Sequence, residues 1–322
     1  MPRLAGGSSS TNSASLHAAA SLHRPILGIA LKLVSVVLFA GMTLCVKLLG
    51  QAVPVGQTIF VRGLLSIVLL ALIARQTNRL HLLKTSNLKS HALRSLSGTV
   101  SMFCLFTAVT MIPLADVTAI SFTSPMFITL LAMVFLGEQI HRFRWTALAL
   151  GFIGVLIMLG PHLTFADGAS LGVLVALGAA MFSAVAMIFL RMMSGGEHAL
   201  TITFYFSLTF MVCAALTAFA GWVVPTTTQW LLIVGAGVFG VAGQLVMTYS
   251  YRYAPASTIA PLDYTNMIMS VILGYVFFAE IPTASVWIGA PLVVAGGLII
   301  LWREYALKKR PSPPAPEPTP ET

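Results

Sequence analysis

The sequence is poor in charged residues, and above all in acidic ones. Only 8% of its 322 residues are charged, and 9 Asp or Glu face 18 Lys or Arg. A soluble domain carries about 25% charged residues, so this chain lacks the side chains that would cover a water-facing surface. Hydrophobic residues make up 57% of it. The composition therefore predicts an integral membrane protein whose solvent is lipid.

Signatures of catalysis and of cofactor binding are also missing. The 3 cysteines lie in separate apolar runs, without disulfide or metal-ligand spacing. No HExxH pair occurs, and the 7 histidines fall in tails, loops or expected helix ends. The GxGxxG match at Gly235, Gly237 and Gly240 lies inside an apolar segment, where small residues serve helix packing and not dinucleotide binding. We expect no cofactor, no metal and no enzyme, with a membrane-embedded enzyme as a remote alternative.

Apolar segments long enough to cross a bilayer occur along most of the chain. A span needs about 20 apolar residues, and the sequence predicts ten, at roughly these positions: 26–49, 55–74, 92–112, 114–136, 145–160, 170–190, 201–221, 230–249, 255–278 and 285–302. The predicted fold is an all-α membrane bundle. Residues 1–25 and the Pro-rich residues 304–322 are expected to be disordered cytoplasmic tails.

Basic residues alternate between the connecting segments, which predicts the orientation. They lie at Arg75, Arg79, Lys84, Lys89, Arg94, Arg142, Arg144, Arg191, Arg252, Arg303, Lys308, Lys309 and Arg310. The intervening loops near 50–54, 161–169, 222–229 and 279–284 contain no Lys or Arg. Because basic residues are retained on the cytoplasmic side, both termini are expected inside. The net charge of +9 is assigned to this orientation, and no nucleic-acid partner is expected.

One stretch occurs twice, which predicts how the bundle is built. Residues 113–159 align with 255–301 without a gap. The scarcer residue types coincide at four places: Pro113 with Pro255, Glu138 with Glu280, Trp145 with Trp287, and Gly154 with Gly296. Five spans in each of two halves, 26–160 and 161–303, would make the second half an inverted copy of the first. Such inverted repeats are typical of secondary transporters, whose substrate site lies between the halves.

Three segments resemble the ten-span EamA-type branch of the drug/metabolite transporter superfamily. They are KLLGQAVPVGQTIFVRG at 47–63, IPLADVTAISFTSPMFITLLAMVFLGE at 112–138 and GYVFFAE at 274–280. The resemblance covers residues 26–302 and implies a bacterial inner-membrane permease that moves a small organic metabolite by alternating access. An amino acid-like compound is an example of such a metabolite, and uptake of a riboflavin-type vitamin is the alternative. Import or export, and whether the protein forms a homodimer, stay open.

Charged side chains within the spans are the first candidates for function, because each is costly in lipid unless it faces a cavity or a partner. Arg62 could bind a substrate carboxylate or phosphate, or could hold the bundle together by pairing with Asp116. Asp263 is a candidate proton carrier or ligand for a substrate amine, and protons as the coupling ion are a hypothesis that rests on it. Lys47 and Asp116 are candidate gate residues near the outer face, with interfacial contact to water as the alternative. Lys32 is interpreted as a snorkelling charge.

Uncharged polar residues complete the predicted substrate site. The two breaks at Pro125 and Pro261 each come with a polar group, because proline frees carbonyls that neighbouring hydroxyls can satisfy. The predicted lining residues are Ser121, Thr123, Gln244, Tyr264 and Asn266. Helix–helix hydrogen bonding is the alternative role for each of them.

Overall fold

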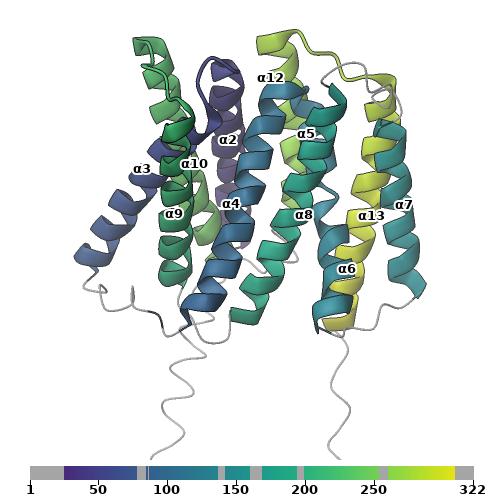
Figure 1. Ribbon diagram of the computed structural model, residues 1–322. Helices are drawn as coiled ribbons and strands as arrows, with labels where there is room; N and C mark the ends of the chain where they lie inside the picture. The colour runs from purple at the N-terminus through teal and green to yellow at the C-terminus, as the bar shows by residue number, and fades with distance from the viewer. Residues whose placement is uncertain are drawn as a thin grey trace, which may run out of the picture.

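The computed structural model describes residues 25–77, 85, 87–136, 142–159, 169–193, 199–253 and 260–308. Its regular secondary structure in these ranges is entirely helical (Figure 1). Residues 1–24 of the predicted N-terminal tail, most of the predicted C-terminal tail and Glu138 lie outside the described residues, whereas Pro25 begins the first described helix. The helix that ends the described part continues to Lys308, beyond the boundary at 303 that the sequence predicted.

The helices run side by side as one bundle (Figure 1). In chain order they are α2 (Pro25–Leu49), α3 (Val55–Gln76), α4 (Leu88–Met111), α5 (Leu114–Ser121), α6 (Ser124–Leu136), α7 (Arg142–Leu159), α8 (Ala169–Met193), α9 (Ala199–Leu216), η3 (Thr217–Ala220), α10 (Thr227–Tyr253), η4 (Ala260–Tyr264), α12 (Thr265–Phe278) and α13 (Ala284–Lys308).

Length and composition suit these helices to a bilayer. Seven described segments are long and apolar enough to cross one, namely 26–49, 55–76, 88–111, 114–135, 170–190, 201–220 and 227–250. Three further apolar helices, at 148–158, 262–278 and 284–299, are shorter. Large apolar side chains such as Val134, Phe152 and Leu231 are more than half exposed. That exposure places lipid, and not water, around the bundle.

Two of the predicted spans are interrupted at matching places in the repeat. In the first, helix α5 ends at Ser121 and α6 begins at Ser124, next to Pro125. In the second, the 3-10 helix η4 ends at Tyr264 and α12 begins at Thr265. Near each break, side-chain hydroxyls take up carbonyls: Ser121 donates to Val117 O at 2.8 Å, Thr123 to Ile120 O at 2.7 Å and Thr265 to Leu262 O at 2.6 Å. These hydroxyls bond carbonyls beside the breaks; the carbonyl four residues before Pro125, that of Ser121, is not among their acceptors.

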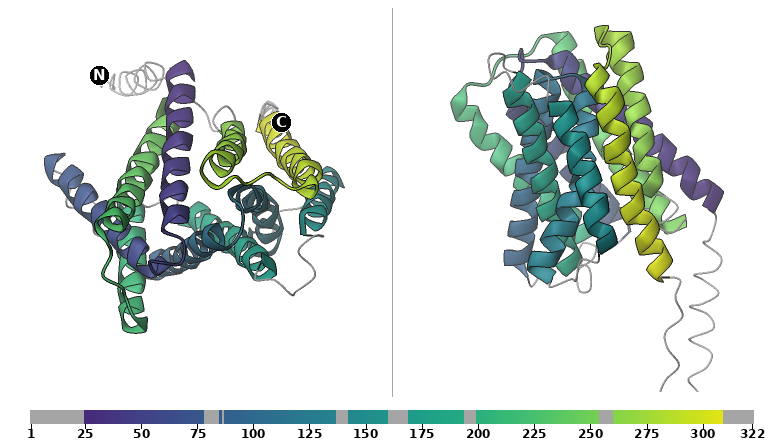
Figure 2. Two further views of the ribbon diagram at one scale, coloured as in Figure 1. Left: turned by 90° about the horizontal axis from the view of Figure 1, so that it is seen from above. Right: turned by 90° about the vertical axis from the view of Figure 1, so that its right-hand side faces the viewer.

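Most helix contacts join a helix of the first half of the chain, α2 to α7, to a helix of the second half, α8 to α13 (Figure 2). Helix α2 packs on α10, and α4 packs on α8. Helix α3 packs on α9, α5 on α12, and α7 on α13. Further contacts join α10 to α3, α9 to α4, α8 to α6 and α2 to α12. The described part of the chain is therefore one interlocked bundle, and sequence neighbours are seldom the main packing partners.

Glycines set the closest of these helix approaches. A Cβ on Gly154 of α7 would lie 2.6 Å from the carbonyl oxygen of Gly289 of α13, and a Cβ on Gly289 would lie 2.5 Å from Gly154 O. On α10, a Cβ on Gly237 would lie 2.5 Å from Leu65 Cδ1, and one on Gly240 would lie 2.9 Å from Arg62 Nε. The interpretation of the GxGxxG match as a packing motif is confirmed.

We expect Gly154→Ala to destabilise the bundle by about 1–3 kcal/mol, because the added methyl group would force the α7 and α13 backbones apart. Gly178→Ala is the matched control, since its Cβ would meet nothing nearer than Cys104 Sγ at 3.9 Å. The measurement is thermal unfolding of the detergent-purified full chain. Equal melting temperatures for the two variants would contradict the expected α7–α13 contact.

Candidate functional site

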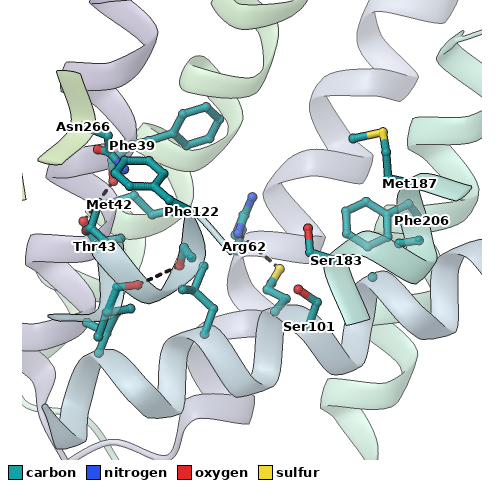
Figure 3. A pocket seen from close by; sticks show the side chains of 18 of the residues that line it. Phe39, Met42, Thr43, Arg62, Ser101, Phe122, Ser183, Met187, Phe206 and Asn266 are labelled. Atoms are coloured by element: carbon teal, nitrogen blue, oxygen red, sulfur yellow. Dashed lines mark hydrogen bonds between the residues drawn. The ribbon is translucent and has the colours of Figure 1, made fainter. Parts of the chain in front are cut away.

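A cavity of about 400 Å³ lies between the helices of the bundle (Figure 3). Side chains of α2, α3, α4, α5, α8, α9 and α12 line it. Ligand sites for small molecules are typically about 300–1,000 Å³, so the space suits a small metabolite. The polar lining residues are Thr43, Arg62, Arg94, Ser101, Thr118, Ser121, Ser183 and Asn266. The wall also contains aromatic and Met side chains: Phe39, Met42, Met102, Phe122, Met187 and Phe206.

Helix α4 contributes one continuous stripe to this wall. Arg94, Gly98, Ser101, Leu105 and Val109 all line the cavity. They follow one another at intervals of three or four residues, which places them on one face of a helix. The same helix is fixed against α8, because Ser101 Oγ donates to Ala179 O at 2.8 Å. The arginine and the serine of the stripe therefore face the cavity from a firmly packed element.

Arg62 enters the cavity from α3. Its Nη1 donates to Met102 Sδ at 3.2 Å, and its Cζ lies 5.8 and 5.9 Å from the ring centroids of Phe106 and Phe210. Its Nε is buried without a hydrogen-bond partner. A thioether is a weak acceptor, so the guanidinium keeps most of its hydrogen-bonding capacity. Gly240 of α10 leaves the room that this side chain occupies.

Arg94 enters the same cavity from α4. Its Cζ lies 4.2 Å from the centroid of the Phe206 ring, and its Nε and Nη1 are buried without hydrogen-bond partners. From the sequence, Arg94 was counted among the basic residues of the connecting segments, although the predicted span 92–112 contains it, and it was not named as a site residue. Helix α4 begins at Leu88, a turn earlier than predicted, because the Asn87 side chain accepts from Ser90 N at 3.3 Å and caps it. The signal that could have identified Arg94 is its place inside that span, because a charge there is costly in lipid unless it faces a cavity or a partner.

A smaller cavity of about 80 Å³ adjoins the two arginines on their far side. It is lined by Arg62, Arg94 and Phe206, which also line the large cavity, and by Gln244 of α10. The predicted lining residue Gln244 therefore lies behind the arginines and not in the large cavity.

The lysines of α2, in contrast to the arginines, have carboxylate partners. Lys32 Nζ lies 2.5 Å from Asp263 Oδ1 in η4. Lys32 is 1% exposed, so the interpretation of it as a snorkelling charge is wrong. The Asp263 side chain is 53% exposed. A buried ammonium next to a carboxylate that faces open space is a charge pair with access from one side.

Lys47, at the opposite end of α2, pairs with Glu280 just after α12. Its Nζ also donates to Ile112 O at 2.9 Å, and Glu280 Oε2 accepts from Leu114 N at 3.1 Å. This junction ties α2, α4, α5 and α12 together at one end of the bundle. Asp116, the other predicted gate residue, is buried in the first turn of α5 with 4% exposure.

The remaining predicted site residues are spread over several environments. Ser121 and Asn266 line the large cavity. Thr123 is 3% exposed and lies at the α5–α6 break. Tyr264 lines an apolar groove between α12 and α13, and its ring packs on Phe122 at 4.8 Å between centroids. The Phe122–Tyr264 contact thus separates that groove from the large cavity, because Phe122 lines the latter.

A helical, lipid-solvated bundle around one partly polar cavity is the architecture of a membrane transport protein. The model of the EamA-like transporter family matches residues 26–160 and 170–302, so the chain belongs to this family. The resemblance described from the sequence is thereby confirmed.

Individual relatives share the fold but differ in what they carry. The chain is 28% identical to a pseudopaline exporter of Pseudomonas aeruginosa, over 88% of this chain and 96% of the exporter. It is 30% identical to a riboflavin transporter of Vibrio cholerae, over 71% and 76%. It is 29% identical to an S-adenosylmethionine uptake transporter of Rickettsia conorii, over 71% and 76%. These relatives and the apolar helices support a multi-pass protein of the inner membrane.

A solved crystal structure has the same fold. It superposes with a TM-score of 0.59 at 18% identity, over 88% of this chain and 99% of that one. At this identity the likeness concerns the fold alone.

We expect Asp263→Asn to lower the stability of the full chain by about 2 kcal/mol, because it removes the carboxylate that pairs with the buried Lys32 ammonium. The loss should be smaller than for a fully buried pair, because Asp263 is half exposed. The measurement is thermal unfolding in detergent. In the double variant Lys32→Met/Asp263→Asn, part of the loss should be recovered. Strictly additive effects of the two substitutions would contradict the pairing, and Lys89→Met, which changes an exposed residue of α4, is the control.

Proposed function

We propose that this protein is a secondary-active permease for a small organic metabolite, which passes through the large cavity between the helices. The observation that carries the proposal is a cavity of about 400 Å³ with two arginines, several hydroxyls and aromatic side chains, enclosed by a lipid-solvated bundle. Membership of a transporter family supports the same function. An amino acid-like compound is one example of such a metabolite.

Ten spans in two inverted halves form part of the proposal. If the alignment of 113–159 with 255–301 is extended to the preceding helices, α2 corresponds to α8, α3 to α9 and α4 to α10. This exchange turns the α2–α10 contact into the α8–α4 contact, and the α6–α8 contact into the α12–α2 contact. The pairs α3–α9 and α7–α13 map onto themselves. Such an exchange of contacts supports a two-fold relation between the halves.

The two ion pairs of α2 suit the role of latches in alternating access. Both join α2 to the η4–α12 segment, but Lys32 and Lys47 are separated by about 22 Å along the helix at 1.5 Å per residue. A relative movement of the two segments that opens one end would strain one pair and spare the other. We propose the Lys47–Glu280 junction as the outer latch and the Lys32–Asp263 pair as the inner one.

Proton coupling and orientation complete the proposal. A carboxylate facing hydrocarbon is costly, so the exposed side of Asp263 suits a water-filled path along which a proton could reach it. Asp263→Asn should then remove the pH dependence of flux in proteoliposomes, and flux with unchanged pH dependence would contradict coupling through Asp263. Both termini are proposed to be cytoplasmic; α2 begins and α13 ends at the same end of the bundle, which supports this (Figure 1).

We expect Ser183→Trp to abolish most transport, because the indole would fill the cavity that Ser183 lines. The substrate is first found by comparing the metabolites of cells and medium with and without the gene, and its flux is then measured for each variant. Met181→Trp is the control, because Met181 lies on the same helix with 47% exposure and does not line the cavity. Unchanged flux in Ser183→Trp would contradict passage through this cavity.

Uptake of a riboflavin-type vitamin is a second candidate. The rings of Phe39, Phe122 and Phe206 in the cavity wall favour it, because such side chains can stack on a flat ring. Labelled riboflavin offered to cells that express the chain separates this candidate from the first. Accumulation that Ser183→Trp abolishes would support it.

A further inference from the structure

We propose that the substrate is an organic anion whose acidic group is held between Arg62 and Arg94. The inference rests on the proposed transport function and names the chemistry of its substrate. It depends on the charge balance of the bundle, on the position of the two guanidinium groups, and on the composition of the rest of the cavity.

The charge balance within the described helices is uneven. Asp263 and Glu280 face the two lysines of α2. In the described part of the chain neither Arg62 nor Arg94 has a carboxylate within salt-bridge distance. A guanidinium stays charged in proteins and is costly to bury without an anion. The described part of the bundle therefore contains two half-buried cationic groups without a carboxylate partner, and a bound anion would supply one.

Both guanidinium groups occupy the same place in the molecule. Each lines the large cavity and the small one behind it, and so does the Phe206 ring, which lies under Arg94. Arg62 comes from α3 and Arg94 from α4, so two independent helices present forked donors to one region. Three of their nitrogen atoms are buried without a hydrogen-bond partner. Carboxylates and phosphates are the groups that accept paired N–H donors from such forks.

The other residues that line the cavity indicate the chemistry of the rest of the ligand. Phe39, Met42 and Phe122 form an apolar wall, while Ser183 and Asn266 offer a few polar contacts (Figure 3). The acidic residues Asp116, Asp263 and Glu280 do not line this cavity. The site thus favours a molecule with an acidic group at one end and an apolar or aromatic body.

A purely structural role for the arginines and an anion-binding role predict opposite effects of their replacement on the stability of the protein. If Arg62 held the bundle together, Arg62→Gln would lower the melting temperature of the protein without ligand. If Arg62 instead serves to bind an anion, Arg62→Gln removes a charge that has no carboxylate partner in the protein without ligand. The melting temperature of this variant should then equal or exceed that of the wild type. The same reasoning applies to Arg94→Gln.

The first experiment uses probes of one shape and different charge. The full chain, purified in detergent, is unfolded thermally with phenylacetate, phenyl phosphate, 2-phenylethanol or phenethylamine. We expect a concentration-dependent rise in melting temperature with one or both anions, and none with the neutral or the cationic probe. A rise with phenylacetate alone assigns a carboxylate, and a rise with phenyl phosphate alone assigns a phosphate. Equal effects of all four probes, or no effect of either anion, would overturn the proposal.

The second experiment assigns the effect to the two residues. Arg62→Gln and Arg94→Gln should each weaken binding of the anionic probe about tenfold or more, because each removes charge-assisted hydrogen bonds. Arg62→Lys keeps the charge but not the fork and should lie between the wild type and Arg62→Gln. Arg75→Gln on α3 and Lys89→Gln on α4 remove exposed charges from the same helices and should leave binding unchanged.

Failure of this inference differs from failure of the proposed function. If the cell comparison finds no transported metabolite, the transport function is wrong. If it finds a neutral or cationic metabolite whose flux survives Arg62→Gln and Arg94→Gln, transport stands and the anion site is wrong. Flux of an acidic metabolite that both substitutions reduce at least tenfold supports the two together.

Discussion

The structure depends on one constraint: a charge within a lipid-solvated bundle needs a partner or a cavity. The chain has few acidic residues, and the described helices use two of them, Asp263 and Glu280, to pair the lysines of α2. Those pairs join α2 to the η4–α12 segment. The same shortage leaves Arg62 and Arg94 facing the cavity without a carboxylate in the described chain. Because charge in hydrocarbon is costly, the arrangement of these few side chains explains both how the bundle is tied together and where a ligand would sit.

The helix breaks belong to the same physical argument. At α5–α6 and at η4–α12 the backbone leaves regular helix in the middle of a span, and hydroxyls take up nearby carbonyls. Irregular backbone at this depth is tolerated where it is buried in protein or lines a cavity. Ser121 at the first break lines the large cavity, and Asp263 lies at the second. The two breaks therefore have similar backbone geometry but differ in charge, because Ser121 is neutral and Asp263 is acidic.

Sequence patterns predicted the parts of the molecule that follow from periodicity and composition. The helical membrane class, the family and the packing role of Gly237 and Gly240 could all be read from apolar segments and small-residue spacing. The side-chain partners could not, because an ion pair such as Lys32–Asp263 joins residues far apart in the chain, and no local pattern encodes that distance. Arg94 was missed for a different reason: it was counted among the basic residues of the connecting segments, although the predicted span 92–112 contains it.

The family model matches the chain twice, over residues 26–160 and 170–302, and differences between the two copies determine the chemistry of the cavity. Ser121 stands where the second copy has Asp263, so one break offers a hydroxyl and the other a carboxylate that pairs with Lys32. Arg62 and Arg94 both come from the first half of the chain. A symmetric pocket would present the same groups to a ligand from both sides. This one presents cations from α3 and α4 and apolar rings from α2 and α5, so it can orient a molecule whose two ends differ. Because fold alone does not determine function, such asymmetry is where relatives with different cargoes are expected to diverge.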